Sequence, residues 1–270
     1  MTDVADQDYL LNEQYRDASN LNARIELHRR FSTNRYDWQR WVFDHLELPA
    51  TARVLELGCG PADLWRQNLD RVPPGWDVVL SDMSAGMLEQ ARANLAAAPP
   101  RRFRFELADA QSLPFGDGTF DAVVANHMLY HVPDRSRALG EIRRVLVPGG
   151  TLHAATNGQG HMGELFAMVA RCVPEAANLS GGAVEFGLEN GARQLAPWFP
   201  EIQRHDYEDG LVVTEAGPLI AYVLSSRAWG DLAEDDPRLD CFVDLVKAQL
   251  AETGRIDITK STGLFVARRP

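Results

Sequence analysis

The stretch Arg53-Val54-Leu55-Glu56-Leu57-Gly58-Cys59-Gly60-Pro61-Ala62 decides the fold. Its first half is a short apolar run typical of a buried strand, and two glycines break that run sharply. Glycine lets a backbone turn tightly and approach a ligand where a Cβ would collide. The helix expected next would point its amide groups and the positive end of its dipole at that ligand. By itself, such a turn fits many nucleotide-binding sheets as well as a plain strand–helix connection.

Strands and helices alternate from this stretch onward. Short turns between them predict a parallel sheet covered by helices on both faces. The apolar run Asp121–Ala125 is typical of a strand buried on both sides. Ser84 and Asp134 are the predicted N-caps of two helices, of which the first runs over 85–98. Further strands are expected at Asp77–Leu80, Phe103–Leu107, Phe120–Ala125 and Thr151–Thr156, the last after the turn Pro148-Gly149-Gly150.

The two flanks of this alternation are less regular. Apolar residues at helical spacing predict helix over 21–46, and a helix is expected to follow the glycine turn as far as about Arg71. The predicted organisation is an N-terminal helical lid over residues 1–50 and one α/β domain over 51–270, with halves 51–157 and 158–270. Beyond Asn157 the pattern predicts helices at Met162–Val173, Asn190–Trp198, Pro218–Ser225 and Arg238–Glu252, and strands at Ile202–Tyr207 and Thr262–Ala267.

The composition excludes several classes of function. A formal net charge of −11 argues against binding to nucleic acid backbones, because that affinity comes from clustered Lys and Arg. The polar segment Met1–Gln7 is unlike a signal peptide, and no window approaches the roughly 20 apolar residues of a membrane helix. Cys59, Cys172 and Cys241 lie far apart and offer neither a zinc spacing nor a disulfide framework. We therefore expect a cytoplasmic protein without a metal, a membrane partner or a nucleic acid partner.

Two acidic residues follow the glycine turn at the ends of the next two predicted strands. Asp82 lies 22 residues after Gly60, and Asp109 follows the third strand. Carboxyl ends of parallel strands share one edge, where open α/β sheets bind their ligands. A carboxylate at Asp82 can accept hydrogen bonds from both hydroxyls of a ribose, with Met83 against an adenine face, and Asp109 can accept one from the adenine amine. Each aspartate alone also fits a solvated loop, but together with the turn they favour a nucleoside-containing cofactor.

Five motifs occur in a fixed order along the chain: Leu55-Glu56-Leu57-Gly58-Cys59-Gly60, Ser81-Asp82-Met83-Ser84, Ala108-Asp109-Ala110, Phe120-Asp121-Ala122-Val123 and Arg143-Arg144-Val145-Leu146-Val147-Pro148-Gly149-Gly150. Their order and spacing resemble class I S-adenosylmethionine-dependent methyltransferases, and especially the branch of ubiquinone- and menaquinone-type C-methyltransferases and small-molecule methyltransferases. The resemblance is strong over residues 53–157 and loose in the flanks. It implies a Rossmann-like, seven-stranded, mostly parallel sheet with helical insertions in the C-terminal half. It also implies S-adenosylmethionine as cofactor and S-adenosylhomocysteine as product.

The resemblance further implies which residues bind the cofactor. The glycine turn would lie under the methionine and ribose, Glu56 would position the amino end, and the strand end at Asn126 would lie near the reactive methyl. One departure is Pro61, which removes an amide donor from the turn, although Ala62 keeps the following helix close. The full implied set is Glu56, Gly58, Cys59, Gly60, Asp82, Met83, Met87, Asp109, Ala110, Asn126 and His127.

The acceptor side of the site is less defined by the sequence. His127 and His131 follow the fourth strand and are candidate general bases, because imidazole titrates near neutral pH. A role in shaping the loop is the favoured alternative, since methyl transfer from an activated cofactor needs mainly alignment. A zinc site is disfavoured, because neither the Glu of a His-Glu-x-x-His motif nor another ligand is near. The residues proposed for substrate and lid contacts are Tyr15, Arg24, His28 and Phe31, and Arg24 and His28 fit a solvated helix face equally well.

Two other classes of function fit parts of the sequence. A nicotinamide-dependent oxidoreductase would want a third glycine at position 63, where Asp63 stands, and has no need of Asp109. A non-catalytic S-adenosylmethionine-binding partner or sensor fits the whole motif set. We expect an enzyme that methylates a small metabolite, because the charge is negative and no appended recognition domain is visible. The sequence leaves open the acceptor, the methylated atom and the oligomeric state.

Overall fold

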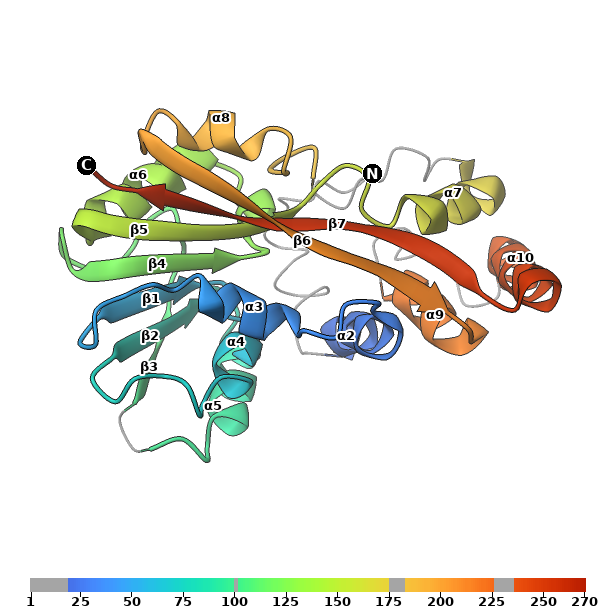
Figure 1. The fold of residues 1–270 in the computed structure, drawn as a ribbon, viewed down its shortest axis with the longest axis horizontal. Helices are drawn as coiled ribbons and strands as arrows, with labels where there is room; N and C mark the ends of the chain where they lie inside the picture. Colours follow the sequence, from blue (N-terminus) through green and yellow to red (C-terminus); the bar gives the residue numbers. More distant parts are fainter. Residues whose placement is uncertain (1–18, 100–101, 175–182, 226–235) are drawn as a thin grey trace.

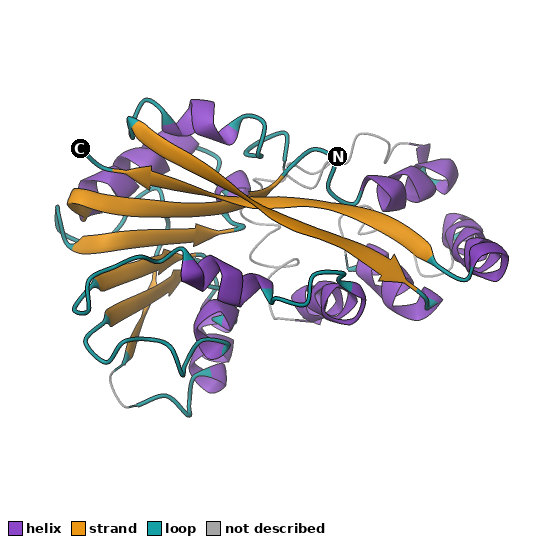
Figure 2. Cartoon of the chain, viewed as in Figure 1, coloured by secondary structure: helices purple, strands orange, loops and turns teal. Residues whose placement is uncertain are grey.

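A single seven-stranded sheet organises the computed structural model, which describes residues 19–99, 102–174, 183–225 and 236–270 (Figures 1 and 2). The strand order is β3-β2-β1-β4-β5-β7-β6. The first five strands in this order run parallel, whereas β7 is antiparallel to both β5 and β6. The predicted mostly parallel, seven-stranded sheet is therefore confirmed. The strands are β1 (Arg53–Leu57), β2 (Asp77–Asp82), β3 (Phe103–Leu107), β4 (Phe120–Asn126), β5 (Leu146–Asn157), β6 (Glu201–Val213) and β7 (Ile256–Arg268).

Alternate residues of the central strands pack on opposite faces of the sheet, as the two-residue period of a strand requires. Leu55 of β1 and Val123 of β4 belong to the apolar cluster that also holds α6 (Arg135–Val145) and α8 (Gly191–Leu195). Val54 and Val124 belong to the cluster on the other face, with α3 (Trp38–Asp44), α4 (Asp63–Arg66) and α5 (Ala85–Asn94). Figure 1 shows these two groups of helices on either side of the sheet. The central strands are thus buried on both sides, as their apolar runs predicted.

The β6–β7 pair extends beyond the rest of the sheet. β5 pairs only with residues 262–268 of β7, whereas β6 pairs with β7 along all of 256–268. The extension packs in its own apolar cluster with α2 (Ser19–Phe31), α7 (Gly163–Cys172), α9 (Ala216–Leu224) and α10 (Pro237–Thr253). Figure 1 shows these four helices around the far end of the two long strands. The N-terminal helix α2 therefore belongs to the same body as the C-terminal helices.

Two predicted helices are shorter than the sequence suggested. The helix expected over 21–46 is two helices, because Asp37 accepts hydrogen bonds from the backbone amides of Gln39 and Arg40 and so starts α3 as a new element. The helix expected to reach Arg71 ends at Arg66, and the side-chain amide of Asn68 donates to the carbonyl of Leu64. The side-chain amide supplies the hydrogen bond that the next helical turn would otherwise give to this terminal carbonyl, so the helix can end here.

Other boundaries differ mainly in length. The predicted caps are confirmed, because Ser84 accepts a hydrogen bond from the Met87 amide and Asp134 from the Arg137 amide. The first of these helices, α5, ends at Asn94 rather than at residue 98. The turn predicted at 148–150 instead lies inside β5, next to an irregularity in its pairing with β4. The two late strands run for 13 residues each, because they continue past the sheet into the extension.

The cysteine prediction is wrong. Cys172, near the end of α7, forms a disulfide with Cys241 in α10, although 69 residues separate them in the chain. Sequence spacing gave no indication of this pair because the two helices meet only through their packing around the β6–β7 extension. Cys59 is a free, buried thiol. None of the helices in the described ranges combines the length and the apolar composition that crossing a bilayer requires.

Candidate cofactor and acceptor site

The glycine turn after β1 adopts a backbone that favours glycine at two positions. Gly58 has φ +61° and Gly60 has φ +52°. A Cβ on Gly58 would lie 2.8 Å from the Cβ of Met128, which belongs to the loop after β4. The turn is held to the neighbouring strand by the amide of Cys59, which donates to the Ser81 carbonyl at 2.9 Å. Gly58 is therefore required both by its conformation and by the close approach of the next loop.

Asp82, the last residue of β2, is bound to the turn. One of its carboxylate oxygens accepts a hydrogen bond from the Gly60 amide and the other accepts one from the Ser84 amide, both at 2.9 Å. Burial raises the pKa of Asp82, although hydrogen bonds from the amides of Ser84, Gly60 and Met83 favour its charged form. A carboxylate offers about four lone pairs, which is more than these three amides use. The side chain is thus fixed in place and can still accept a hydrogen bond from a ligand.

Asp109 lies on the same edge of the sheet, two residues beyond the end of β3. Its carboxylate accepts hydrogen bonds from the backbone amide and the side-chain amide of Gln111 within its own loop. The Ala108 amide donates to the Asp82 carbonyl at 3.1 Å, which joins this loop to the end of β2. The structure therefore brings the two acidic loops together, as the shared carboxyl edge predicted. The adjacent Ala110 is buried.

Glu56 points into the apolar cluster beneath α4. Its side chain is 2% exposed and accepts a hydrogen bond of 2.6 Å from the indole nitrogen of Trp65. Burial raises the pKa of Glu56 to about 8 despite that hydrogen bond. Burial also raises the pKa of the neighbouring Cys59 thiol. Met87, on α5, is likewise a core residue. Trp65 was not identified from the sequence, where only its aromatic character marks it as a core residue.

The loop after β4 combines an uncommon backbone conformation, a buried polar oxygen and a histidine with a lowered pKa. His127 has φ +56°, a conformation that is uncommon for a residue with a side chain and that occurs at functional sites. The side-chain oxygen of Asn126 is buried and has no hydrogen-bond partner among the described residues, while its amide nitrogen donates to Gln39. Burial, with smaller contributions from Lys260 and His131, lowers the pKa of His127 to about 4. The His131 ring lies beside Tyr130, 4.5 Å between centroids.

The predicted lid residues on α2 pack against the extension rather than against solvent. Arg24 donates to the hydroxyl and the carbonyl of Ser225 at the end of α9. His28 lies beside His161 and Tyr222, with ring centroids 6.1 and 5.8 Å away. Phe31 is a member of the apolar cluster around the extension. The solvated-face alternative for Arg24 and His28 is therefore wrong, and Tyr15 lies outside the described residues.

Asp209 of β6 anchors the end of α2, a role that the sequence did not reveal. Its carboxylate binds the hydroxyls of Ser32 and Thr33, the Asn34 amide and the ammonium group of Lys260. Burial alone would raise the pKa of Asp209, but the hydrogen bonds from Lys260 and Ser32 lower it to about 2. The run of polar, turn-forming residues at 32–34 indicates that α2 ends there, but it does not indicate that Asp209 is the partner. Asp209 therefore fixes α2, and with it His28, over this end of the molecule.

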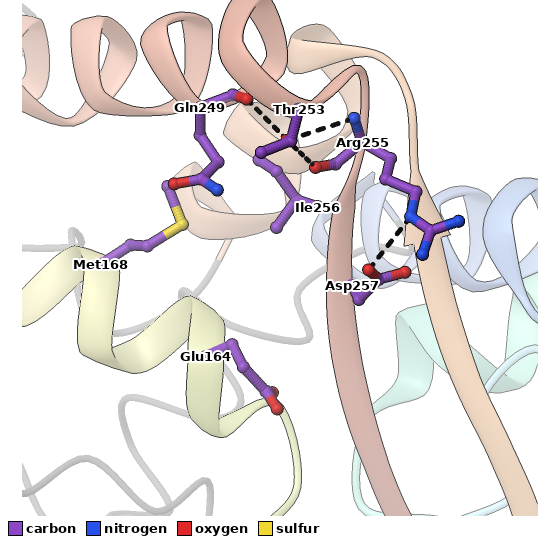
Figure 3. A pocket seen from close by; sticks show the side chains of 7 residues that line it. All are labelled: Glu164, Met168, Gln249, Thr253, Arg255, Ile256 and Asp257. Atoms are coloured by element: carbon purple, nitrogen blue, oxygen red, sulfur yellow. Dashed lines mark hydrogen bonds and ion pairs between the residues drawn. The ribbon is translucent and has the colours of Figure 1, made fainter.

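Two surface cavities lie on the extension rather than at the edge of the sheet that holds Asp82 and Asp109. The larger, about 670 Å³, is lined from α7, α10 and β7 by Glu164, Met168, Gln249, Thr253, Arg255, Ile256 and Asp257 (Figure 3). The second, about 520 Å³, shares Glu164 and Asp257 with it. Neither cavity includes a residue of the predicted cofactor set. Within the described ranges, no three His, Cys, Asp or Glu side chains are grouped to hold a metal ion.

Comparisons with known proteins agree with the motif order. Residues 54–150 match the family model of a methyltransferase domain. A demethylmenaquinone methyltransferase of Symbiobacterium thermophilum is 37% identical over 120 residues, which are 42% of this chain and 47% of that protein. A ubiquinone/menaquinone biosynthesis C-methyltransferase of Hahella chejuensis is 38% identical over 116 residues, 43% of this chain and 47% of that protein. The chain thus spans about half the length of these curated relatives.

Solved structures share the fold at low sequence identity. A putative methyltransferase from Bacillus halodurans has a TM-score of 0.59 and 17% identity, over 86% of this chain and 99% of that one. A phosphoethanolamine N-methyltransferase of Haemonchus contortus, solved with S-adenosyl-L-methionine, has a TM-score of 0.59 and 18% identity, over 100% of this chain and 60% of that one. Residues 54–150 of the chain therefore form a methyltransferase domain of the class I S-adenosylmethionine-dependent family.

Proposed function

We propose that the chain transfers a methyl group from S-adenosylmethionine to a small-molecule acceptor. The observation that carries the proposal is the set of unused hydrogen-bond acceptors at the carboxyl edge of the sheet. The carboxylate of Asp82 has more lone pairs than its three backbone amides use, and the side-chain oxygen of Asn126 is buried without a hydrogen-bond partner among the described residues. A buried acceptor without a partner costs about 1–3 kcal/mol, which a bound donor would recover. Ribose hydroxyls and an α-ammonium group are donors of the kinds that these positions require.

The residues of the edge can be assigned to parts of this cofactor. Asp82 would accept hydrogen bonds from the ribose, and the turn at Gly58 and Gly60 would let the ligand approach the backbone. The loop 108–110 and Met83 would contact adenine. Asn126 would accept a hydrogen bond from the α-ammonium group. Glu56 would act indirectly, because its bond to Trp65 fixes α4 beneath the turn.

The bound cofactor would supply a methyl group that is already activated by its sulfonium charge. The chain then has to align the acceptor and exclude water. At neutral pH His127 is an uncharged imidazole, because burial lowers its pKa to about 4. Such a group accepts a hydrogen bond well but is a weak base. We therefore assign His127 to orienting the acceptor, whereas the position of His131 beside Tyr130 suits a role in shaping the loop.

The acceptor is proposed to be a small molecule. Two relatives are named as methyltransferases of demethylmenaquinone and of ubiquinone/menaquinone biosynthesis, and one structural neighbour is named as a phosphoethanolamine N-methyltransferase. The net charge of −11 disfavours a nucleic acid as the acceptor. The matched residues 54–150 contain the cofactor edge, whereas α2, β6, β7 and α9 lie outside them. The acceptor is therefore expected to be recognised by residues that are particular to this chain.

The cofactor assignment is tested by titrating S-adenosylhomocysteine and NAD into the purified protein by calorimetry. We expect micromolar or tighter binding of S-adenosylhomocysteine and at least roughly 100-fold weaker binding of NAD, a difference of about 2.7 kcal/mol. The reason is geometric, because Asp63 replaces the third glycine of a dinucleotide turn and starts α4. Tight binding of NAD without binding of S-adenosylhomocysteine would instead favour an oxidoreductase.

A further inference from the structure

A disulfide joins two helices that pack on the β6–β7 extension. Cys172 is the last residue of α7, and Cys241 lies in the second turn of α10. Both helices lie outside the matched methyltransferase residues 54–150. A domain of this size buries enough apolar surface to be stable without a covalent cross-link. The role of the disulfide therefore has to be sought in the two helices that it joins.

α7 is held in place independently of the disulfide. Its buried residues Leu165, Val169 and Cys172 recur at helical spacing and face the apolar cluster of the extension. At the start of the helix, the carboxylate of Glu164 accepts hydrogen bonds from the amide and the hydroxyl of Thr259 in β7, at 2.8 and 2.5 Å. α7 is thus expected to keep its position when the disulfide is opened.

α10 is held less firmly than α7. Of its 17 residues, all of which the structure describes, only Phe242 and Val246 are buried. Leu239, Leu245 and Leu250 are partly buried against the same apolar cluster. Short helices are only marginally stable in water by themselves, so the position of α10 depends on its packing. The covalent bond to α7 is therefore a substantial part of what holds this helix.

The two helices separate toward the end opposite the disulfide. Met168 precedes the cysteine of α7 and Gln249 follows the cysteine of α10, and both line the cavity of about 670 Å³ (Figure 3). The helices therefore run antiparallel, joined at the disulfide and with open space between their other ends. Thr253 of α10 and Ile256 of β7 line the same space. The disulfide is thus the covalent closure of the pair at its narrow end.

The two cysteines differ in their access to solvent. Cys241 is an exposed residue, whereas Cys172 is buried. A thiolate attacks a disulfide at the sulfur that it can reach, so attack is expected at Sγ of Cys241, with Cys172 as the leaving group. Cys59, the free thiol, is buried in a different apolar cluster and takes no part. The disulfide is therefore open to exchange with a thiol from solution.

We propose that the Cys172–Cys241 pair is a site of reversible thiol–disulfide exchange, and that its reduction by a dithiol releases α10 from α7. The first thiolate of the dithiol attacks Sγ of Cys241, the bond between the two cysteine sulfurs breaks, and Cys172 leaves as a thiolate that takes up a proton. The second thiolate of the dithiol then attacks the mixed disulfide and releases Cys241 in the same way. The dithiol is oxidised to its disulfide, and two electrons and two protons pass to the protein.

Release of α10 would act on the acceptor side of the proposed enzyme and spare the cofactor side. α10 packs against α9 and shares one apolar cluster with α9 and α2. The glycine turn, in contrast, is held by the hydrogen bond between Gly60 and Asp82 within the matched residues. Reduction is therefore expected to slow methyl transfer, which needs an aligned acceptor, and to leave cofactor binding unchanged. This consequence rests on the proposed function, whereas the exchange at the two cysteines does not.

The exchange is tested first by counting thiols. The protein is equilibrated with oxidised glutathione or with dithiothreitol, then unfolded and alkylated with iodoacetamide, and its mass is measured. We expect one alkylated cysteine after the oxidant, namely Cys59, and three after the reductant, with a return to one when the oxidant is restored. Three alkylated cysteines after the oxidant, or one after the reductant, would overturn the proposal.

Hydrogen exchange of the whole protein then locates the effect of reduction. Amides of 237–253 are expected to exchange at least roughly tenfold faster with dithiothreitol, because a disulfide typically stabilises by more than this factor. Amides of 163–172 and of the central strand 53–57 should change by less than about twofold. An unchanged rate in 237–253, or an equal increase in 163–172, would contradict release of α10.

Two variants separate the disulfide from other effects of the reductant. The double variant Cys172→Ser with Cys241→Ser should show fast exchange in α10 both with and without dithiothreitol. Lys247→Ser, on the exposed surface of the same helix, is the matched control and should respond to the reductant as the wild type does. A double variant that still responds to the reductant would contradict the assignment. The comparison of oxidised and reduced wild type decides the question even if the double variant does not fold.

Cofactor binding and methyl transfer distinguish this inference from the proposed function. We expect the affinity for S-adenosylhomocysteine to agree within about twofold between the two redox states, and labelled methyl transfer into a metabolite extract to fall at least about fivefold on reduction. A redox-dependent affinity, or transfer that reduction leaves unchanged, would overturn the assignment to the acceptor side. If S-adenosylhomocysteine binds in neither state, the proposed function fails, while the thiol counts and hydrogen exchange still decide the release of α10.

Discussion

Asp82→Ala is expected to weaken binding of S-adenosylhomocysteine by at least roughly 100-fold. The substitution removes the hydrogen bonding proposed for the ribose, and a hydrogen bond to a charged group is worth about 1.5–3 kcal/mol. It also frees the amides of Gly60 and Ser84, which the carboxylate now holds in the turn and at the start of α5. Both effects act on the same ligand, so the loss should be large. Calorimetric titration measures it directly.

Asp77→Ala is the matched control for this variant. Asp77 begins the strand that Asp82 ends, and its exposed carboxylate pairs with Arg104 at the opposite edge of the sheet. Its loss should leave the affinity for S-adenosylhomocysteine within about twofold of the wild type, since exposed ion pairs contribute little. Circular dichroism should show that both variants keep the native fold. Normal affinity in Asp82→Ala would remove the ribose assignment.

The second large effect is a steep loss of stability on mild acidification. His153 of β5 is 2% exposed, and burial lowers its pKa to about 3. The pKa values of His28 and His127 are lowered to about 3 and about 4. In the unfolded chain these groups titrate near 6.5, so below that pH the unfolded state binds more protons than the native state. The free energy of unfolding then falls as the pH falls.

The size of this effect follows from linkage. Between about pH 6.5 and pH 4.5, each such histidine removes about 2–3 kcal/mol. Three of them together approach the whole stability of a typical domain, about 5–15 kcal/mol. We expect the melting temperature to fall by roughly 15 °C or more over this range. Thermal unfolding followed by circular dichroism at a series of pH values is the measurement.

Two substitutions in β5, at neighbouring positions, test the cause. His153→Gln removes a titrating group. The free energy of unfolding should then fall less steeply with pH, because the unfolded state takes up about one proton fewer relative to the native state. Thr151→Val removes the hydroxyl that binds the His153 ring at 3.0 Å but keeps the imidazole, so the slope should persist. A melting temperature that stays constant from pH 6.5 to pH 4.5 would show that these histidines are not held neutral in the native state.

The sequence predicts the cofactor half of the molecule well because that half follows from local patterns. A strand, a two-glycine turn and a helix cap are each encoded within a few residues, and Asp82 and Asp109 are placed by the shared edge of parallel strands. The seven-stranded sheet could be expected only through the family resemblance. The late strands Ile202–Tyr207 and Thr262–Ala267 were recognised, but their full length was not.

The acceptor side could not be predicted because it depends on contacts between distant segments. Asp209 holds the residues 32–34 across more than 170 positions of sequence, and no local pattern marks such a contact. The disulfide between Cys172 and Cys241 has the same origin. His28 and His127 were candidates from their positions, but only the fold brings His28 together with His161.

The central claim, methyl transfer to a small molecule, is tested most directly by isotope tracing. The protein is incubated with a metabolite extract and S-adenosylmethionine that carries a deuterated methyl group, and the mixture is analysed by mass spectrometry. We predict a small molecule that gains the labelled methyl only when both protein and cofactor are present, and not with Asp82→Ala. Label that appears only in RNA, DNA or protein would contradict the small-molecule acceptor. If S-adenosylmethionine binds but no label is transferred to anything, the account of the chain as an enzyme is wrong.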